Sequence, residues 1–376
     1  MKRIVIAIIC LIMLAGCGPS MEDNTTSTCQ GWTMFRANQQ NTGIENSHCA
    51  PPDSQLDLLW KFAASGAVIQ TPVSRNGKIF VGSIGKKFHC IDQSSGQEIW
   101  NYDTSDEVTS PAALTKDKVV FVTKEPSLFC LDQNTGDQIW TFKPSGQISI
   151  PTVDTDYVYF CVGSPQNEFY KLNLNDGEII WAKSIGSSSR GCPAFFGTNL
   201  VLGCADGTLK LIDIDTGKQT SSIQTSGSIT TSIVVVENQL FFSTYEGKMH
   251  CHDMMTGKEK WVKNIGTNQE SSPSIWRNNI YFGANDGYFY CLDARNGVQK
   301  WAYDTGVMRR IISSPAVSNG MVWFASEDNY VYCFNAITGE KLWSYKTGDR
   351  IWSSPIITGN KIIIGCNDAN VYCFGK

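Results

Sequence analysis

Cysteine and histidine are the residues of this sequence whose side chains could bind a metal or carry redox chemistry. The chain has 14 cysteines and 4 histidines, and the densest group is His250-Cys251-His252. In a β-strand the two histidines would share one face while Cys251 points to the other. No Cys-x-x-Cys spacing occurs in the chain, so the sequence predicts no metal site. The segment Asp213-x-Asp215-x-Gly217 lacks the third Asp and the terminal Glu of an EF-hand loop, and we interpret it as an ordinary turn.

Six of the cysteines recur at one position of a sequence repeat, two places before the position that is Asp in most copies. They are Cys90, Cys130, Cys251, Cys291, Cys333 and Cys373, and Lys171 and Leu211 stand at this position in the other two copies. Equivalent strands of neighbouring repeats are expected to lie too far apart for a disulfide, whose Cα separation is usually below about 7 Å. We therefore expect small, buried, free thiols. Cys29 and Cys49 lie outside the repeats, and the sequence leaves open whether they form a disulfide or are two unrelated thiols.

Tryptophan and proline mark the boundaries of the repeat. Tryptophans stand at 60, 100, 140, 181, 261, 301 and 343, and prolines at 72, 111, 151, 193, 273, 315 and 355, while Ser221 and Ile233 take the missing places. Each unit of about 40 residues contains four short apolar runs separated by Gly, Asp and Asn turns, without helical periodicity. This is the period and strand count of a β-propeller blade.

The count of units predicts how the ring closes. Complete units end at 100, 140, 181, 221, 261, 301 and 343, and an eighth begins at Pro355 but lacks its last strand. Leu58-Leu59-Trp60-Lys61 is a last strand with no unit before it. The sequence therefore predicts an all-β fold, an eight-bladed β-propeller of four-stranded antiparallel blades that an N-terminal strand closes, leaving no open sheet edge.

The recurring Asp-x-x-x-Gly-x-x-x-Trp motif resembles the tryptophan-docking repeat of the PQQ-like (quinoprotein alcohol dehydrogenase-like) β-propellers, over residues 55–376. The motif residues are Asp92, Gly96, Trp100, Asp132, Gly136, Trp140, Trp181, Gly217, Trp261, Trp301 and Trp343. We interpret them as structural, because Asp can cap the turn, Gly can take a positive φ and Trp can wedge between blades. The segment Trp32–Arg36 with Asn41–Gly43 is similar to the lead-in ahead of many such propellers.

The resemblance implies two kinds of function. Quinoprotein alcohol dehydrogenases hold PQQ above a calcium ion in the central funnel, under a disulfide between adjacent cysteines, whereas BamB-like lipoproteins bind an outer-membrane barrel-assembly protein. This chain has no adjacent cysteine pair and no long insertions. We therefore expect no cofactor and no catalytic residue, but a non-catalytic scaffold that presents a propeller face to a protein partner in outer-membrane β-barrel assembly. A PQQ-dependent oxidoreductase and a carbohydrate- or peptide-binding propeller are the alternatives.

The N-terminus has the pattern of an exported protein. Lys2 and Arg3 precede an apolar run, Ile4–Leu14, that is too short to span a bilayer and is typical of a secretory signal peptide. Leu14-Ala15-Gly16-Cys17 resembles the bacterial lipobox, which predicts a lipid anchor at Cys17 on the periplasmic side, the outer membrane being favoured. The expected organisation is a signal peptide at 1–17, a tether and lead-in at 18–54 and the propeller at 55–376.

Charge and loop composition bear on the partner. The net charge is −4 and no long run of Lys or Arg occurs, which argues against nucleic acid. The loops that join each tryptophan strand to the next blade should emerge on one face, and they carry the candidate partner-binding residues Arg190, Arg309, Arg310, Arg350 and Trp352. Arg and Trp are enriched at binding hot spots. We expect the protein to be a monomer.

Overall fold

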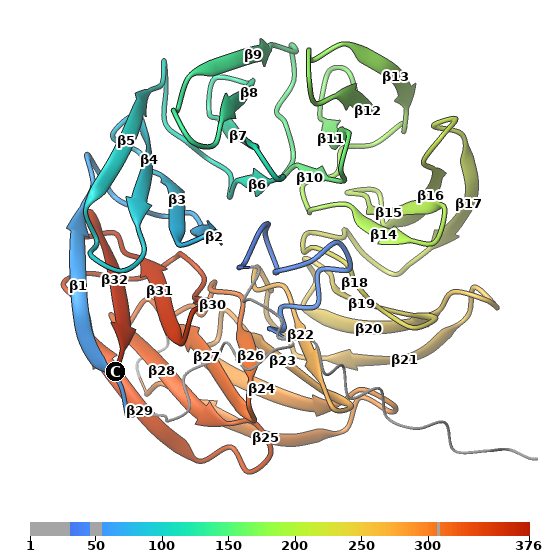
Figure 1. The fold of residues 1–376 in the computed structure, drawn as a ribbon. Helices are drawn as coiled ribbons and strands as arrows, with labels where there is room; N and C mark the ends of the chain where they lie inside the picture. The colour runs from blue at the N-terminus through green and yellow to red at the C-terminus, as the bar shows by residue number, and fades with distance from the viewer. Residues whose placement is uncertain (1–30, 46–54, 307–308) are drawn as a thin grey trace, which may run out of the picture.

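The computed structural model describes residues 31–45, 55–306 and 309–376, whose strands form eight four-stranded antiparallel sheets around a central axis (Figure 1). The predicted fold class, an all-β eight-bladed propeller, is confirmed. Cys17, Cys29, Cys49 and the expected signal peptide lie outside the described residues. Within the described ranges, no helix is long and apolar enough to cross a membrane.

The blades are numbered along the chain, and the strands of each are given from the axis to the rim. Blade 1 is β2 (Val73–Arg75), β3 (Lys78–Gly82), β4 (Lys87–Asp92) and β5 (Glu98–Asp103); blade 2 is β6 (Ala113–Leu114), β7 (Lys118–Thr123), β8 (Ser127–Asp132) and β9 (Gln138–Phe142); blade 3 is β10 (Thr152–Val153), β11 (Tyr157–Val162), β12 (Glu168–Asn173) and β13 (Ile179–Ser184); blade 4 is β14 (Ala194–Phe196), β15 (Asn199–Gly203), β16 (Thr208–Asp213) and β17 (Gln219–Gln224). Blade 5 is β18 (Val234–Val236), β19 (Gln239–Ser243), β20 (Lys248–Asp253) and β21 (Glu259–Asn264); blade 6 is β22 (Ser274–Trp276), β23 (Asn279–Gly283), β24 (Tyr288–Asp293) and β25 (Gln299–Asp304); blade 7 is β26 (Ala316–Ser318), β27 (Met321–Ala325), β28 (Tyr330–Asn335) and β29 (Lys341–Lys346); blade 8 is β30 (Ile356–Thr358), β31 (Lys361–Gly365), β32 (Asn370–Gly375) and β1 (Asp57–Ala63).

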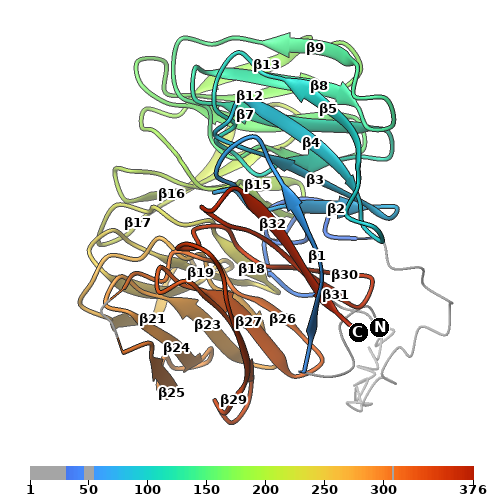
Figure 2. The same cartoon turned by 90° about the vertical axis from the view of Figure 1, so that its left-hand side faces the viewer.

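Blade 8 is assembled from the two ends of the described chain. β1 pairs antiparallel with β32, from Asp57 opposite Gly375 to Ala63 opposite Asn370. In both views β1 lies along β32 at the rim of the ring (Figures 1 and 2). The predicted closure by an N-terminal strand is therefore confirmed, and the strand is longer than the four residues that the sequence suggested.

Packing explains why cysteine recurs in the third strands. Cys90 pairs with Trp100 and Cys291 with Trp301, and the same cysteine–tryptophan pairing recurs in blades 2, 5, 7 and 8. A small side chain at this position leaves room for the indole opposite in these six blades, whereas Lys171 lies opposite Trp181 in blade 3. The ten cysteines of the described ranges are all buried and free, which confirms the expectation for the six repeat cysteines. Burial raises the pKa of the Cys90 thiol to about 12, so this thiol stays protonated and unreactive.

Tryptophans of the fourth strands join seven of the eight blades to the next one. The Nε1 of Trp100 donates to the carbonyl oxygen of Gln133 in blade 2 at 3.3 Å. The ring also lies against a glycine of that blade, because a Cβ on Gly136 would come within 2.7 Å of it. Gly136 has a φ of 79°, and the preceding Asp132 closes the turn by accepting hydrogen bonds from backbone amides.

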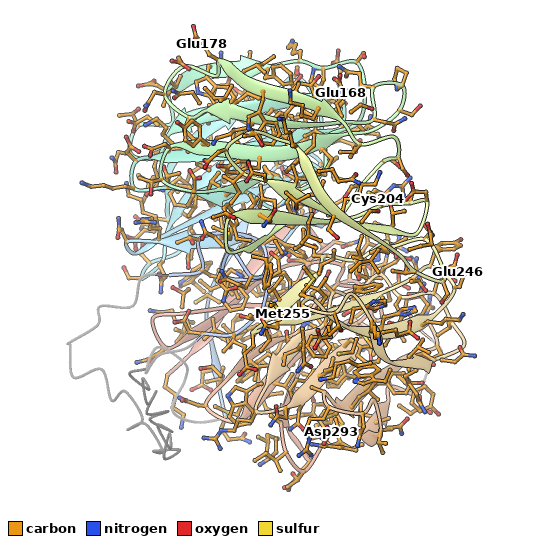
Figure 3. All side chains as sticks on the ribbon, turned by 90° about the vertical axis from the view of Figure 1, so that its right-hand side faces the viewer. Glu168, Glu178, Cys204, Glu246, Met255 and Asp293 are labelled. Atoms are coloured by element: carbon orange, nitrogen blue, oxygen red, sulfur yellow. The ribbon has the colours of Figure 1, made fainter. Side chains whose placement is uncertain are left out.

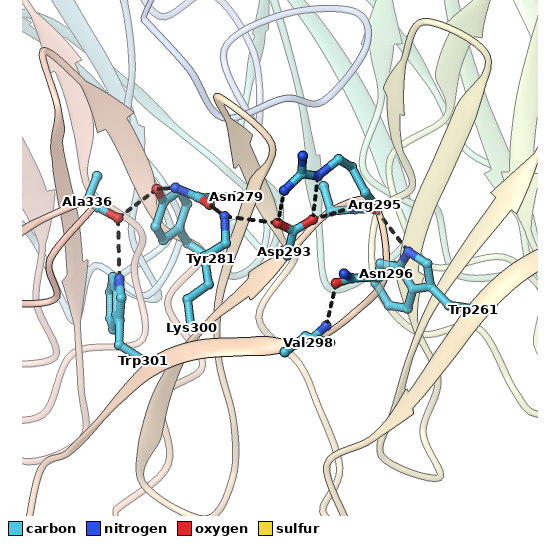
Figure 4. A network of polar contacts seen from close by, with 11 residues as sticks. Trp261, Asn279, Tyr281, Asp293, Arg295, Asn296, Val298, Lys300, Trp301 and Ala336 are labelled. Carbon is cyan, nitrogen blue, oxygen red and sulfur yellow. Dashed lines mark hydrogen bonds and ion pairs between the residues drawn. The ribbon is translucent and has the colours of Figure 1, made fainter.

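Figure 4 shows this docking on both sides of blade 6. Trp261 of blade 5 donates to the Ala294 carbonyl at 2.9 Å, and Trp301 of blade 6 donates to the Ala336 carbonyl at 3.4 Å. Between them, Asp293 accepts from Arg295 and forms an ion pair with Lys300 at 3.1 Å. These bonds, led by those from Arg295, hold the pKa of the Asp293 carboxyl well below its usual range.

The interface between blades 4 and 5 lacks an indole. Ser221 stands at the tryptophan position, is exposed, and lies opposite the larger Leu211. A Cβ on Gly257 would meet only Ile223, at 3.9 Å, where the equivalent glycines of other blades meet a tryptophan. At this junction apolar contacts take the place of the indole. Ile223 of blade 4, for example, packs against the core that contains Phe242 of blade 5.

Residues 31–45, which we call the plug, lie at the centre of the ring (Figure 1, dark blue). Plug carbonyl oxygens accept backbone hydrogen bonds from the inner strands of six blades. The pairs are Trp32 with Ser74, Thr33 with Leu114, Gln39 with Phe195, Gln40 with Val235, Thr42 with Ile275 and Gly43 with Val317, at 2.7–3.3 Å. The side chain of Gln39 adds a seventh blade through the Val153 carbonyl at 3.1 Å. One short segment therefore ties nearly the whole ring together.

Arg36 anchors the plug. Its side chain is 2% exposed, and its guanidinium donates to the carbonyl oxygens of Pro315 at 2.6 Å and Pro273 at 2.7 Å. A third hydrogen bond goes to the hydroxyl of Ser274. Burial lowers the pKa of Arg36 to about 9, which leaves the guanidinium charged at neutral pH. Its hydrogen bonds are therefore charge-assisted, the stronger kind.

Substitution of Gly43 tests the importance of the plug. Gly43 has a φ of 66°, and a Cβ there would overlap the Arg36 guanidinium. Gly197 has a similar φ of 58° with nothing within 4 Å of a Cβ, so it is a matched control. We expect Gly197→Ala to cost about 1 kcal/mol through backbone strain and Gly43→Ala to cost roughly 3 kcal/mol, measured by denaturant unfolding. Equal losses would show that the plug adds little to the stability of the ring.

Candidate protein-binding funnel

The two faces of the ring carry different loops. The hairpin face carries the first and third turns of each blade, such as residues 76–77 and 93–97. The crossover face carries the second turn and the loop to the next blade, such as residues 83–86 and 104–112. Seen from the rim, Glu168, next to a second turn, and Glu246, within one, lie toward one side (Figure 3). Met255, in a third turn, lies toward the other.

The crossover face opens into a central funnel of about 350 Å³. Phe35 of the plug forms its floor, so the funnel is closed on the side of the hairpin face. Apolar side chains line the wall, among them Ile69, Ile150 and Ile312, and Glu270, Arg310 and Trp352 stand with them. A cavity with apolar walls and a few charged or aromatic groups is the usual form of a binding site.

Glu327 brings two of the predicted partner residues together. It lies in the turn between β27 and β28, and its side chain is 8% exposed. Arg310 donates to one carboxylate oxygen at 2.7 Å and to the other at 3.3 Å, while Trp352 Nε1 donates at 2.7 Å. Arg310 also lies 3.4 Å from Glu270. The carboxylate of Glu327 therefore holds both side chains in place at the funnel mouth.

The electrostatics of this group favour its ionised form. Burial opposes ionisation of Glu327, but hydrogen bonds from Arg310 and Trp352 outweigh burial and lower the pKa of Glu327. The hydrogen bond with Glu327 in turn raises the pKa of Arg310. The charge of Arg310 is thus paired with that of Glu327, and this ion pair fixes the positions of both side chains.

The remaining candidate arginines are exposed. The Arg350 guanidinium lies over the Trp352 ring at 4.9 Å, a cation–π contact at the surface. Arg190 and Arg309 are also exposed, and neither lines the funnel. The structure therefore brings Arg310, Arg350 and Trp352 into one group and leaves Arg190 and Arg309 outside it.

Sequence reasoning missed the two acidic residues of this group, Glu270 and Glu327. Glu327 belongs to a second turn, and the antiparallel order of the strands places second turns on the same face as the crossover loops. This topological rule is the signal in the sequence that points to Glu327.

The funnel does not fit the quinone and calcium site that the family resemblance offers as an alternative. A calcium ion needs free carboxylate or carbonyl oxygens, and Glu270 and Glu327 are both engaged by Arg310. The cysteines that the structure describes are buried within the blades, and none of them lines the funnel. No chemical step through such a group follows from these residues.

Comparison with known proteins gives a family, a relative in sequence and solved structures that share the fold. The family model described as "Beta-alanine-activating enzyme, beta-propeller" matches residues 62–375. Outer membrane protein assembly factor BamB of Nitrosomonas eutropha is 20% identical over 230 residues, and the match covers 56% of each chain, so this chain spans little more than half of that relative.

Two solved structures share the fold. BamB from Moraxella catarrhalis superposes with a TM-score of 0.72 at 17% identity, covering 86% of this chain and all of that one. A europium-containing methanol dehydrogenase superposes with a TM-score of 0.79 at 14% identity, covering 92% of this chain and 98% of that one. At these identities the likeness shows the fold alone.

Glu327→Gln tests the network at the funnel mouth. The amide keeps the size of the side chain but loses its charge, and we expect the variant to be less stable at pH 7 by about 2 kcal/mol. Since the folded pKa of Glu327 is lowered, the extra stability of the wild type is fully present above about pH 4.3 and is lost as the pH falls through the folded value. Denaturant unfolding from pH 7 to pH 3 measures this difference. Glu340 is exposed, so Glu340→Gln is the control. If the difference in unfolding free energy between wild type and Glu327→Gln does not become smaller in acid, the network is contradicted.

Proposed function

We propose a function for this chain, which belongs to the β-propeller family of the beta-alanine-activating enzyme. The proposed function is non-catalytic: a monomeric, lipid-anchored propeller of the bacterial envelope that binds a protein partner on its crossover face. The observation that carries it is the pair formed by the exposed Arg350 and the half-buried Trp352, whose indole Glu327 holds at the mouth of a funnel closed behind by the plug. A preorganised aromatic and arginine pair beside an apolar recess is the usual composition of a binding hot spot.

The funnel and its rim indicate the chemistry of the partner. Ile69, Ile150 and Ile312 offer an apolar wall. Arg350 does not line the cavity, but it places an exposed positive charge over Trp352, which does. Since Arg310 is neutralised by Glu327 and Glu270, Arg350 is the arginine of this group that is available for an incoming carboxylate. The segment that fits is a loop or chain end with an apolar side chain next to an acidic one.

The similarity to BamB of Nitrosomonas eutropha supports a role for this chain in outer-membrane protein assembly. That protein is an outer membrane protein assembly factor by name, and a role in the assembly of outer-membrane β-barrel proteins is our proposal for this chain. The proposal also includes the anchor at Cys17, because the lipobox-like segment ends there. A second candidate, a binder of free peptide or carbohydrate, is favoured by the funnel volume of about 350 Å³.

An arginine on each face makes a matched test of the partner surface. Arg277 lies over Trp276 at 4.6 Å on the hairpin face, as Arg350 lies over Trp352 at 4.9 Å on the crossover face. Both arginines are exposed, so reversal of either charge should change stability by less than about 0.5 kcal/mol. We expect Arg350→Glu to reduce in-cell cross-links to protein partners at least tenfold and Arg277→Glu to leave them unchanged, as quantified by mass spectrometry.

Two results would contradict the partner surface. The crossover face is excluded if Arg350→Glu keeps its cross-links, and a general charge effect is indicated if Arg277→Glu loses as many. A thermal shift on adding oligosaccharides or short peptides, with no protein cross-linked at Arg350, would favour the second candidate.

Cys17→Ser tests the anchor. We expect the variant to move from the membrane pellet to the soluble fraction, because the acyl chains proposed at Cys17 supply the membrane affinity. Cys29→Ser is the control and should stay in the pellet. Retention of Cys17→Ser in the pellet after a salt wash would rule out the anchor.

A further inference from the structure

The two histidines of β20 meet a carboxylate that their sequence spacing does not reveal. The Nδ1 of His250 lies 3.0 Å and the Nε2 of His252 lies 3.5 Å from the same oxygen of Glu259, in the neighbouring β21. One ligand atom from each of the three residues lies within 4.8 Å of the other two. Glu259 pairs with His252 across a bulge in the ladder, which turns its side chain to the face of the histidines.

The imidazoles are buried and incompletely bonded. His250 is 0% and His252 is 3% exposed, and Phe242 stacks on His250 with ring centroids 5.0 Å apart. Within the described part of the chain, Nε2 of His250 and both nitrogens of His252 have no hydrogen-bond partner, since the 3.5 Å contact of His252 Nε2 with Glu259 is not a hydrogen bond. Buried polar nitrogens are normally satisfied, so three unsatisfied atoms in one cluster call for an explanation.

Blade 1 provides an internal comparison. His89 and Glu98 occupy the positions of His250 and Glu259, with His89 Nδ1 2.6 Å from the Glu98 carboxylate. Ile91 stands where blade 5 has His252. A histidine–glutamate pair is therefore sufficient for packing at this position, and the added feature of blade 5 is the third ligand.

The three residues face the junction that lacks a tryptophan. Leu240 and Phe242 lie opposite His252 and His250, and both belong to the core shared with blade 4. At this junction Ser221 replaces the indole that fills the equivalent space elsewhere. Glu259 is 37% exposed, so the cluster can be reached from solvent at this side.

We propose that His250, His252 and Glu259 bind a divalent cation of the first transition-metal row, with Zn²⁺ as the preferred ion. Two imidazoles and one carboxylate are a ligand set that suits Zn²⁺, with the fourth position left to water or to a group of another molecule. Ligands at about 2.1 Å from a tetrahedral ion lie about 3.4 Å apart. The 3.0 and 3.5 Å contacts of Glu259 already match that spacing. From a separation of at most 4.8 Å, the imidazoles need to approach by no more than roughly 1.4 Å to reach it.

The test uses the full chain, stripped of metal with a chelator and with accessible thiols blocked by iodoacetamide, so that cysteine does not contribute. Calorimetric titration with Zn²⁺ gives affinity and stoichiometry, and the visible absorption of Co²⁺ reports a tetrahedral site. The variants are His252→Ile, which recreates the arrangement of blade 1, and Glu259→Gln, which changes a partly exposed side chain. Glu98→Gln in blade 1 is the matched control. Circular dichroism without metal shows whether each variant is folded.

We expect one Zn²⁺ per chain in the wild type and in Glu98→Gln, with affinity reduced at least tenfold in both His252→Ile and Glu259→Gln. The absence of Zn²⁺ uptake by the wild type overturns the proposal. Uptake that persists in Glu259→Gln or in folded His252→Ile also overturns it, because the ion is then bound elsewhere. If His252→Ile is unfolded, Glu259→Gln alone decides.

Discussion

The pairing of β1 with β32 is the contact on which the rest of the ring depends. The other blades are built from consecutive strands, whereas blade 8 needs the two ends of the described chain to meet. The same N-terminal region docks on both sides of that blade, since Trp343 of blade 7 donates to the Leu56 carbonyl at 3.1 Å and Trp60 donates to Gln93 of blade 1 at 3.1 Å. With the plug at the axis, the first described residues hold the ring at its rim and at its centre. The loops of the crossover face keep their mutual positions because both contacts hold.

The sequence was sufficient for the fold because each repeat specifies its own blade and its contact with the next. In a repeat architecture stability is local, so spacing alone reports the period, the strand count and the place of closure. The spacing of the tryptophans, with Ser221 in the missing place, predicted all eight blades, and Leu58–Lys61 identified the closing strand. The role of Arg36 could not be read in the same way, since its partners Pro273 and Pro315 lie more than 200 residues away and in two different blades.

The residues of the two candidate sites were harder to predict for a related reason. Arg310, Glu327 and Trp352 come from three different connections, and the sequence shows the period of these connections but not which side chains turn toward one another. Glu259 joins the two histidines through a bulge that shifts the register of β21 against β20. Alternation along a single strand placed His250 and His252 on one face correctly, yet it carried no information about the neighbouring strand.

The plug also limits how the partner that we propose could occupy the centre of the ring. An annulus open at both ends would let an extended chain thread through it, but here Phe35 lies at the base and the backbone of residues 32–43 is bonded to six inner strands. Entry and exit must therefore use the same opening. A polypeptide bound there would have to insert a terminus or a bend. It could be released without unthreading. Its dissociation rate would therefore depend on the contacts at the mouth of the funnel and not on the length of the bound chain.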